Sequence, residues 1–567
     1  MTSGVLAAVG RGDPLALVVG PAGPTVASAA GSLDVTVDDV RRIEADLAPR
    51  WVWWSAPSVA GVLHDVPLAR AWDLAAVHRL LHGGWRAEPG LVWARSHDLD
   101  PEAVPARREP DLFDLGPAPD ELEEPLDADG HLRPEWVAGD WSTTSPRRAR
   151  WATLALDAAA RQRDAVDALT VLRPQAMATA RAESTAEVLC VELGASGLPV
   201  DVAEAEEILR SIVGTRPRTV ADAEAQRAAR DADVLRHAPP GVRADLRNPA
   251  HVRSLLRRVG LEVTDTRAWR LEQLRDAHPL VDALLVWRRI ERTATTYGYG
   301  WLDEHVRDGR LHGEWTASDG AAGRMTATAG LHNLPAEVRP AVVAEPGHVF
   351  VRADLGQIEP RVLAAVSGDR ALARAAATAD MYAPVAAELA VDRETAKRAV
   401  LGAMYGQTTG HGAQALRRLD ATYPVAMAYL HEADEAGQVG RSIRTYGGRL
   451  IRFGSTNANE VTERDARSRA AARGRYGRNA MIQGAAAELF KRWAVTVRAR
   501  LAGRSLDGEI VLCLHDELLV HTPVAAADEV ATLLDDCLQE AAAGWAPDDT
   551  VRFLADVSVV PRWSDAK

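Results

Sequence analysis

The alternation of apolar and polar positions predicts a strand that passes directly into a helix at residues 349–368. In VFVRADLGQIEPRVLAAVSG, Val349 and Val351 recur at the two-residue period of a strand. From Pro360 onward the apolar positions follow helical spacing, and proline is well tolerated near a helix start. Asp354 falls at the end of the strand, where a carboxylate is costly to desolvate without a cation. This residue is therefore a candidate metal ligand.

A second apolar pattern, EIVLCLHDELLVHTP at residues 509–523, predicts a β-hairpin with His515, Asp516 and Glu517 at its tip. Turn chemistry alone accounts for an aspartate at such a tip, but less readily for two adjacent acids beside a histidine. Two strand-end aspartates that converge from distant parts of a chain form the arrangement that holds a pair of Mg²⁺ ions. We therefore expect Asp354 and Asp516 to bind two Mg²⁺ ions.

Between these two stretches, DRETAKRAVLGAMYG at residues 392–406 predicts a helix with Asp392 at its N-cap. Side chains at four-residue intervals share one slowly turning face of this helix: Arg393, Lys397, Leu401 and Tyr405. Two cations one turn apart repel each other, and a polyanion such as a triphosphate would relieve that repulsion. A solvated basic face is the alternative explanation.

The sequence RYGRNAMIQGAAAELFKRW predicts a further helix at residues 475–493, with Arg475, Asn479 and Gln483 along one edge. Long amides and arginines suit the acceptors of the DNA minor groove, which are nearly the same for every base pair. A buried, hydrogen-bonded stripe would explain the same pattern.

The remaining sequence divides into an α/β region and a helical region. Residues 1 to about 180 predict strands at 15–19 and 52–54 and helices at 72–81 and 151–172. Residues 181 to about 310 predict helices at 183–193, 203–213, 249–259, 268–276 and 279–306. The chain is 567 residues long, which corresponds to about three or four domains.

The net charge of −13 argues against a protein that coats DNA generically. Residues 441–478, however, hold ten arginines against three acids, which favours a local phosphate-binding face over a merely solvated one. The three cysteines are widely spaced, so neither a disulfide framework nor a zinc site is expected, and a reducing cytoplasm fits. The uncharged stretch 14–33 is interrupted by glycine and proline, and we expect neither export nor a membrane span.

These motifs, in this order, resemble the family A DNA polymerases, from about residue 183 to about 563. RADLGQIEPR is similar to the first palm motif of the family, the R-x3-K-x7-YG spacing to its fingers helix, and HDE to its third motif. The resemblance implies that Asp354 and Asp516 are metal ligands and that Glu359 excludes a ribose 2′-hydroxyl. It also implies nucleotide-binding roles for several residues, with Lys397 in addition able to protonate pyrophosphate: Gln357, Glu359, Arg393, Lys397 and Tyr405.

The resemblance further implies which residues contact DNA. Arg324 and Asn333 lie in AGRMTATAGLHNLP, which is similar to the segment that follows the primer–template minor groove. By the same resemblance, Arg475, Asn479 and Gln483 contact the template and minor groove, and His515 and Glu517 lie near the primer end. The chain departs from the family pattern at Leu355-Gly356, Pro360, Tyr382 and Leu401. These departures concern sugar discrimination, fidelity and speed.

The implied fold is an α/β multidomain one, with an RNase H-like, exonuclease-type N-terminal domain followed by a right-hand polymerase domain. We expect residues 1–180 to form a degenerate 3′–5′ exonuclease-like domain, because the first strand is followed by no D-x-E pair and Thr153 replaces the tyrosine expected before Asp157. Residues 181–567 would form the polymerase domain. Its parts would be a thumb at about 181–310, a palm at about 311–370 and 495–567, and fingers at about 371–494.

The leading hypothesis is a cytoplasmic, monomeric enzyme that adds dNTPs to the 3′-hydroxyl of primer–template DNA with two Mg²⁺ ions, with weak or absent proofreading and no membrane association. Three alternatives stay open. They are a catalytically impaired DNA-binding homologue, a palm polymerase with an active 3′–5′ exonuclease, and a related polymerase that makes RNA.

Overall fold

The computed structural model describes residues 4–106, 123–406, 413–454, 463–504, 506–546 and 550–566. The chain divides into two compact units, each made of three segments. The large unit comprises Met1–Ser196, Glu314–Ala327 and Gly347–Val560, and the small unit comprises Gly197–Gly313, Thr328–Pro346 and Pro561–Lys567.

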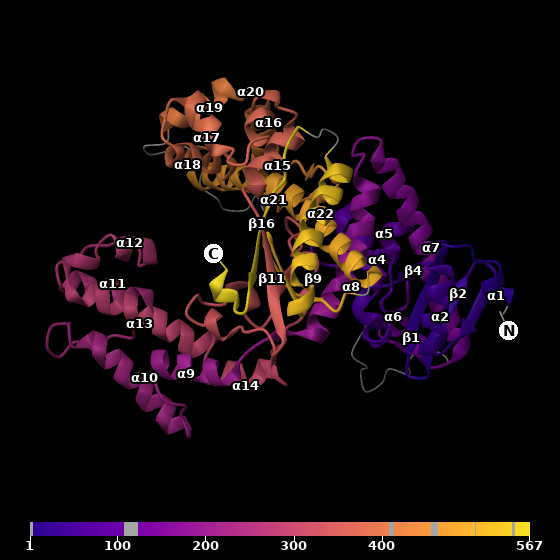
Figure 1. The fold of residues 1–567 in the computed structure, drawn as a ribbon, viewed down its shortest axis with the longest axis horizontal. Coiled ribbons are helices and arrows are strands. Elements are labelled where there is room, and N and C mark those ends of the chain that lie inside the picture. Colours follow the sequence, from indigo (N-terminus) through magenta and orange to yellow (C-terminus); the bar gives the residue numbers. More distant parts are fainter. Residues whose placement is uncertain are drawn as a thin grey trace. The chain divides into compact units, whose positions relative to one another are not determined.

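The first sheet of the large unit has the strand order β3-β2-β1-β4-β5. Its strands are β1 (Pro14–Gly20), β2 (Gly23–Ser28), β3 (Gly31–Asp34), β4 (Arg50–Trp53) and β5 (Ala71–Asp73). Strands β1, β4 and β5 are parallel, whereas β2 and β3 run antiparallel. Helix α7 (Ser145–Thr170) packs on this sheet, and α4 (Leu74–His82) and α8 (Ala176–Ser196) pack against α7 (Figure 1).

The helix predicted at 72–81 is wrong at its start. Trp72 belongs to strand β5, and the helix begins at Leu74 because the Asp73 carboxylate caps it by accepting from Ala76 N. The same buried carboxylate accepts from Trp53 Nε1 at 2.9 Å and from Ala56 N at 2.6 Å. Three donors on one acid make Asp73 a structural residue of this sheet.

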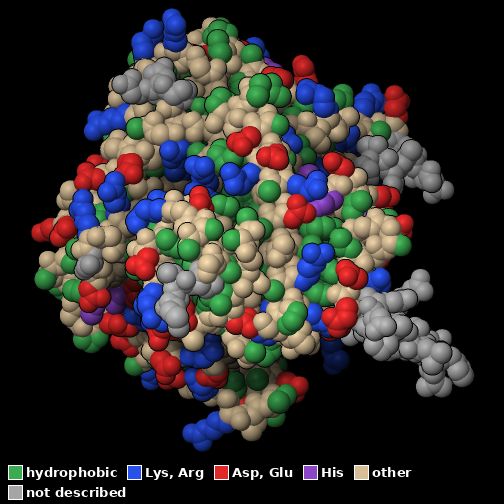
Figure 2. Space-filling model, turned by 90° about the vertical axis from the view of Figure 1, so that its right-hand side faces the viewer, with side chains coloured by type: hydrophobic (Ala, Val, Ile, Leu, Met, Phe, Trp, Pro, Cys, Tyr) green, Lys and Arg blue, Asp and Glu red, His purple; other side chains and the backbone are tan. Residues whose placement is uncertain are grey.

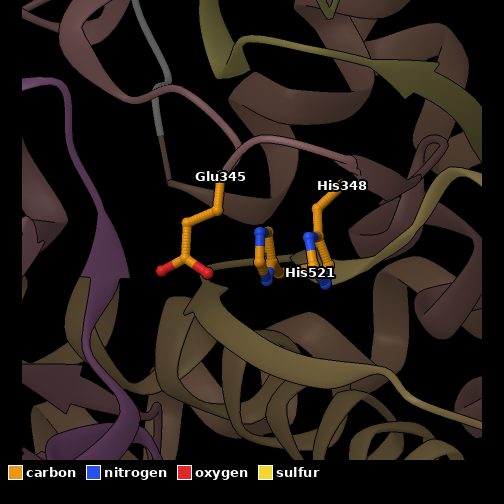
Figure 3. Close-up of side chains that lie close together, drawn as sticks. All are labelled: Glu345, His348 and His521. Atoms are coloured by element: carbon orange, nitrogen blue, oxygen red, sulfur yellow. The ribbon is translucent and has the colours of Figure 1, made fainter.

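The second sheet of the large unit has the order β14-β15-β11-β16, and all its pairings are antiparallel. Its strands are β11 (His348–Leu355), β14 (Glu509–Leu514), β15 (Glu517–Pro523) and β16 (Ala555–Val560). The predicted hairpin at 509–523 is confirmed. Helix α22 (Ala527–Trp545) packs on this sheet and against α21 (Glu463–Gly503) (Figure 1). At one end of β11 the rings of His348 and His521 stack, with centroids 4.6 Å apart (Figure 3), and Asp354 lies at the other end.

A group of helices follows β11 in the chain. They are α15 (Ile358–Ser367), α16 (Arg370–Ala376), α17 (Tyr382–Leu389), α18 (Arg393–Met404), α19 (Ala413–Thr422) and α20 (Pro424–Gln438). The predicted N-cap Asp392 is confirmed, because its side chain accepts from Thr395 N. The helix predicted at 475–493 is the middle of the 41-residue α21, which packs along α20. Two short hairpins, β9 (Trp315–Thr316) with β10 (Thr326–Ala327) and β12 (Ile443–Arg444) with β13 (Leu450–Ile451), complete these elements.

The small unit is mainly helical. It contains α9 (Val202–Val213), α10 (Val220–Leu235), α11 (Pro249–Arg258), α12 (Ala268–Glu272), α13 (Pro279–Thr296) and α14 (Tyr299–His305), with a small sheet of β6 (Leu198–Pro199), β8 (Arg310–Leu311) and β7 (Val306–Arg307). The single helix predicted at 279–306 is two helices. Buried Tyr297 ends the first, and its hydroxyl donates to the carbonyls of Gly330 and Asn333.

Within the described residues, no helix has the length and apolarity needed to cross a bilayer. On the face drawn in Figure 2, basic, acidic and apolar side chains are interspersed. On that face the acidic side chains therefore do not form one continuous negative patch.

Candidate functional site

Two carboxylates that the sequence separates by about 160 positions, Asp354 at the end of β11 and Asp516 in the β14–β15 turn, lie at one end of the second sheet. Asp354 is opposite Glu517 of β15 in the strand register. Leu355 N donates to the carbonyl of Asp516 at 2.9 Å, which ties the end of β11 to the β14–β15 turn. The expectation that these two aspartates converge on one sheet therefore agrees with the register.

Arg352 neutralises part of this acidic cluster. Its guanidinium lies 2.7 Å from Asp354 Oδ2 and 3.0 Å from Glu517 Oε1, so one cation bridges two acids on adjacent strands. Glu517 is buried, and this ion pair compensates for its desolvation. An ion pair of this kind makes Glu517 a partner of Arg352 as well as a candidate site residue.

The electrostatic environment raises the pKa of both aspartates. Burial raises the pKa of Asp354, and the charge of Arg352 opposes that rise. Burial together with the negative charge of Asp354 raises the pKa of Asp516 to about 6. Crowded, half-buried carboxylates of this kind repel each other, and a bound divalent cation relieves that repulsion. The donor set consists of oxygen atoms only, which fits Mg²⁺.

A cavity of about 380 Å³ opens beside Asp516. Its polar lining comes from the loop before β10, the β11–α15 turn and first turn of α15, α17, the end of α18, α21 and the hairpin tip: Arg324, Gln357, Glu359, Tyr382, Tyr405, Gln483, His515 and Asp516. Gln357 and His515 both have positive φ, at 57° and 55°, so two turns with left-handed residues form part of the wall.

A hydrogen-bonded chain crosses one side of the cavity. Tyr405 Oη donates to Glu359 Oε2 at 2.7 Å, and Arg324 Nη2 donates to Glu359 Oε1 at 3.2 Å. Burial and the Glu359 carboxylate raise the pKa of the Tyr405 hydroxyl, which stays a donor at neutral pH. The glutamate is thereby fixed from two sides, and the structure brings together three residues that the sequence analysis singled out.

Arg393 is held by a residue that the sequence analysis did not select. Its guanidinium donates from Nε to Asp380 Oδ2 at 2.6 Å, and Gln357 Nε2 donates to the other oxygen, Oδ1, at 2.8 Å. Lys397, one turn along α18, makes no ion pair or hydrogen bond to any residue that the structure describes. Asp380 therefore links two predicted nucleotide-binding residues. Its only sequence signal is its place just before α17.

The residues predicted to contact DNA fall into two groups. Arg475 is exposed on α21 and packs against Gly406, where a Cβ would lie 2.8 Å from Arg475 Cγ. Asn479 and Gln483 are half-buried further along the same helix, and Gln483 lines the cavity. Asn333 belongs to the small unit, where its carbonyl accepts from Tyr297 and Arg292.

A buried ionic network that the sequence analysis missed supports the loop carrying Arg324. Lys491 of α21 pairs with Glu183 of α8 and also donates to the carbonyl of Ala317 at 3.1 Å. Arg449 pairs with Glu183 at 2.7 Å and donates to Ser318 Oγ at 3.1 Å. Both cations are almost fully buried. A lysine within an apolar helix stripe was the available sequence signal.

Comparison with known proteins gives a family match. The model of the family described as DNA polymerase family A matches residues 249–565. The thermostable DNA polymerase I of Thermus thermophilus is 32% identical over 309 residues, covering 49% of this chain and 36% of that protein. DNA polymerase I of Chloroflexus aurantiacus is 32% identical over 345 residues, covering 56% of this chain and 35% of that protein. The matched region thus spans about a third of the length of these curated relatives.

A solved structure has a similar fold. The POL domain of Pol1 from M. smegmatis, in complex with DNA primer-template and dNTP, matches with a TM-score of 0.64. The match covers 100% of this chain and 99% of that chain at 22% identity, so it concerns the fold alone.

Proposed function

The chain belongs to DNA polymerase family A, and from that premise we propose that it is a DNA-directed DNA polymerase that extends a primer with dNTPs. The observation that carries the proposal is the convergence of Asp354 and Asp516 at one sheet end beside a cavity that also contains the Tyr405–Glu359 pair. Duplex binding alone requires neither crowded carboxylates nor a nucleotide-sized cavity next to them. Retention of both supports catalysis over a non-catalytic DNA-binding role.

The proposed chemistry is two-metal nucleotidyl transfer. Asp354 and Asp516 would hold two Mg²⁺ ions, which when bound stabilise the attacking and leaving oxygens of an in-line displacement. Lys397 has no partner among the described residues and is available for a triphosphate and for protonating pyrophosphate. Arg393 would exchange its bond with Asp380 for the nucleotide's phosphates, and Gln357 would stay hydrogen-bonded to the same acid.

Sugar selection and DNA contacts complete the proposed site. Glu359, held by Tyr405 and Arg324, would exclude a ribose 2′-hydroxyl from the cavity. His515 would lie near the primer end with Glu517. The duplex would be contacted by a separate set of side chains: Arg324, Asn333, Arg475, Asn479 and Gln483.

Residues 1–180 are proposed to be a degenerate 3′–5′ exonuclease-like domain, with thumb, palm and fingers at the boundaries predicted above. The mixed sheet β3-β2-β1-β4-β5 supports an RNase H-like fold. Acids of this region have structural partners: Asp34 of β3 pairs with Arg148 at 3.0 Å, and Asp157 of α7 lies 2.9 Å from His97. Strand β1 itself, PLALVVG, carries no acid. We propose weak or absent proofreading, and a monomeric cytoplasmic enzyme.

Primer extension tests this proposal. The purified chain, a primer–template, Mg²⁺ and either dNTPs or rNTPs should give extension with dNTPs and little with rNTPs, and a chelator should abolish it. Absence of extension at any divalent ion concentration would leave the DNA-binding homologue as the better description. A primer with a mismatched 3′ end, incubated without nucleotides, should stay intact. Its digestion would refute the proposed loss of proofreading.

A further inference from the structure

A fixed loop of the N-terminal region presents Trp85 to solvent. With 70% of its surface exposed, Trp85 is the most exposed aromatic side chain in the part of the chain that the structure describes. Its backbone is nonetheless held, because its carbonyl accepts from Arg79 Nε at 3.0 Å. Gly320 packs against it so closely that a Cβ there would lie 2.6 Å from Trp85 Cβ. An indole exposed from an anchored loop is a candidate contact for a partner.

Two arginines without an acidic partner among the described residues, Arg95 and Arg452, lie near the loop that carries this tryptophan. The Arg452 side chain lies beside Gly83, where a Cβ would be 3.5 Å from Arg452 Cγ. Burial lowers the pKa of His82 to about 4, and the positive charges of Arg95 and Arg452 contribute to this shift, so both arginines lie close to His82. Neither arginine forms an ion pair with a described residue. Cations without an acidic partner in the described part of the chain, close to an exposed indole, match a polyanion that also offers flat, apolar surfaces.

A continuous series of exposed or half-buried side chains joins Trp85 to the cavity. Phe453 follows Arg452 and packs edge to face with Tyr476, with ring centroids 6.0 Å apart. Arg475, the preceding residue on α21, packs on Gly406, which adjoins Tyr405 at the cavity wall. All of these residues belong to the large unit. Aromatic rings and cations alternate along the series, as in grooves that bind single-stranded nucleic acid.

We propose that these side chains bind the unpaired template strand ahead of the templating position, with a base stacked on Trp85. The proposed surface, here called the template strip, consists of Arg475, Tyr476, Arg452, Arg95 and Trp85. The inference rests on the proposed polymerase function, because it assigns the strand that must enter the same cavity. It adds a role for the N-terminal region that requires no nuclease chemistry.

Binding to primer–templates with different template overhangs tests the strip. Fluorescence anisotropy without nucleotides would compare an overhang of one nucleotide with one of about ten. Trp85→Ala should weaken binding of the long overhang by about tenfold, as expected for loss of one base–aromatic stack, and leave binding of the short one unchanged. Arg452→Ala should reduce the slope of log affinity against log salt by about 0.7 on the long overhang only.

Matched controls separate the strip from general effects. Leu172→Ala removes another highly exposed apolar side chain, and Arg163→Ala removes an exposed arginine of α7 without an ion pair to described residues. Neither should change the dependence on overhang length. Equal losses on both overhangs, or no loss with Trp85→Ala, would overturn the proposal and would favour a different partner for this surface.

The outcome is independent of catalysis. If the wild-type chain fails to extend a primer on the one-nucleotide overhang, the polymerase proposal fails. The comparison of the two overhangs in the binding assay still tests whether the template strip binds the unpaired strand. If extension succeeds and the overhang dependence of Trp85→Ala is absent, only the strip is wrong.

Discussion

The hydroxyl of Tyr405 donates to Glu359 at 2.7 Å and so joins the end of α18 to the first turn of α15. Both residues line the cavity beside Asp516. The bond fixes a bulky carboxylate at the wall, where it occupies space that an additional hydroxyl on a substrate would need. Because of this position at the cavity wall, Glu359 is the most direct target for testing substrate selection.

Replacing Glu359 with alanine should relax sugar selection. The change removes the carboxylate and leaves room at the wall, so incorporation of rNTPs relative to dNTPs should rise by about tenfold or more. Single-nucleotide kcat/KM values for the two sugars measure this ratio. Tyr405→Phe is the informative companion, because it keeps the ring and removes only the bond to Glu359. An unchanged ratio in Glu359→Ala would show that another residue excludes the 2′-hydroxyl.

Each of the two aspartates at the sheet end, Asp354 and Asp516, should be needed for extension. Asp354→Asn and Asp516→Asn keep side-chain volume but remove the negative charge that a divalent ion requires. We expect the extension rate to fall by about a thousandfold or more, with primer–template affinity within about threefold of wild type. The matched control is Asp556→Asn, an exposed acid directly opposite Asp354 on β16. Comparable loss in that control would mean that general electrostatics, not ligation, explains the effect.

Buried His78 should make the fold sensitive to acid. Burial and the nearby charges of His82 and Arg95 lower the pKa of His78 to about 3, from about 6.5 in an unfolded chain. The unfolded state therefore binds a proton first, so stability is complete above pH 6.5 and declines as the pH falls toward 3. Between pH 7.5 and pH 5 this group alone should remove about 2 kcal/mol from the unfolding free energy.

His78→Asn should remove that part of the pH dependence. Urea unfolding at the two pH values measures it, as the difference between variant and wild type. His64→Asn, at an exposed histidine, is the control and should leave the pH dependence as it is. If His78→Asn lost as much stability between pH 7.5 and pH 5 as the wild type, the ring would have to be charged in the native state.

Removing the buried lysine of α21 should be strongly destabilising. Lys491→Met leaves Glu183 buried with only Arg449 as a cation and removes the donor to Ala317, at an expected cost of about 3–5 kcal/mol. Arg500→Met on the same helix breaks the solvent-exposed pair with Glu540 and should cost far less stability than Lys491→Met. Denaturant titrations of both variants provide the comparison. Similar small losses would mean that Glu183 is neutral when buried.

Local signals were sufficient for the elements that carry the site. The strand–helix sequence around Asp354, the hairpin tip at Asp516 and the N-cap at Asp392 each depend on residues a few positions apart, and each is present in the structure. The start of α4, in contrast, was predicted two residues too early. Asp73 ends a strand and caps a helix at once, and periodicity alone does not reveal the cap.

Partners far apart in sequence could not be predicted in this way. Lys491 and Glu183 meet across 308 positions, and only the packing of α21 against α8 brings them together. Asp380 was missed because its role depends on accepting hydrogen bonds from Gln357 and Arg393, which come from different elements. The register that sets Asp354 opposite Glu517 likewise depends on how two strands far apart in the sequence are aligned.

The guanidinium of Arg352 has a consequence for how this protein can be handled. Because it already bridges Asp354 and Glu517, the acidic end of the sheet carries a counterion of its own. The fold should therefore survive prolonged chelation, and catalytic competence should return as soon as a divalent ion is supplied. A divalent ion would thus be required for activity but not for folding.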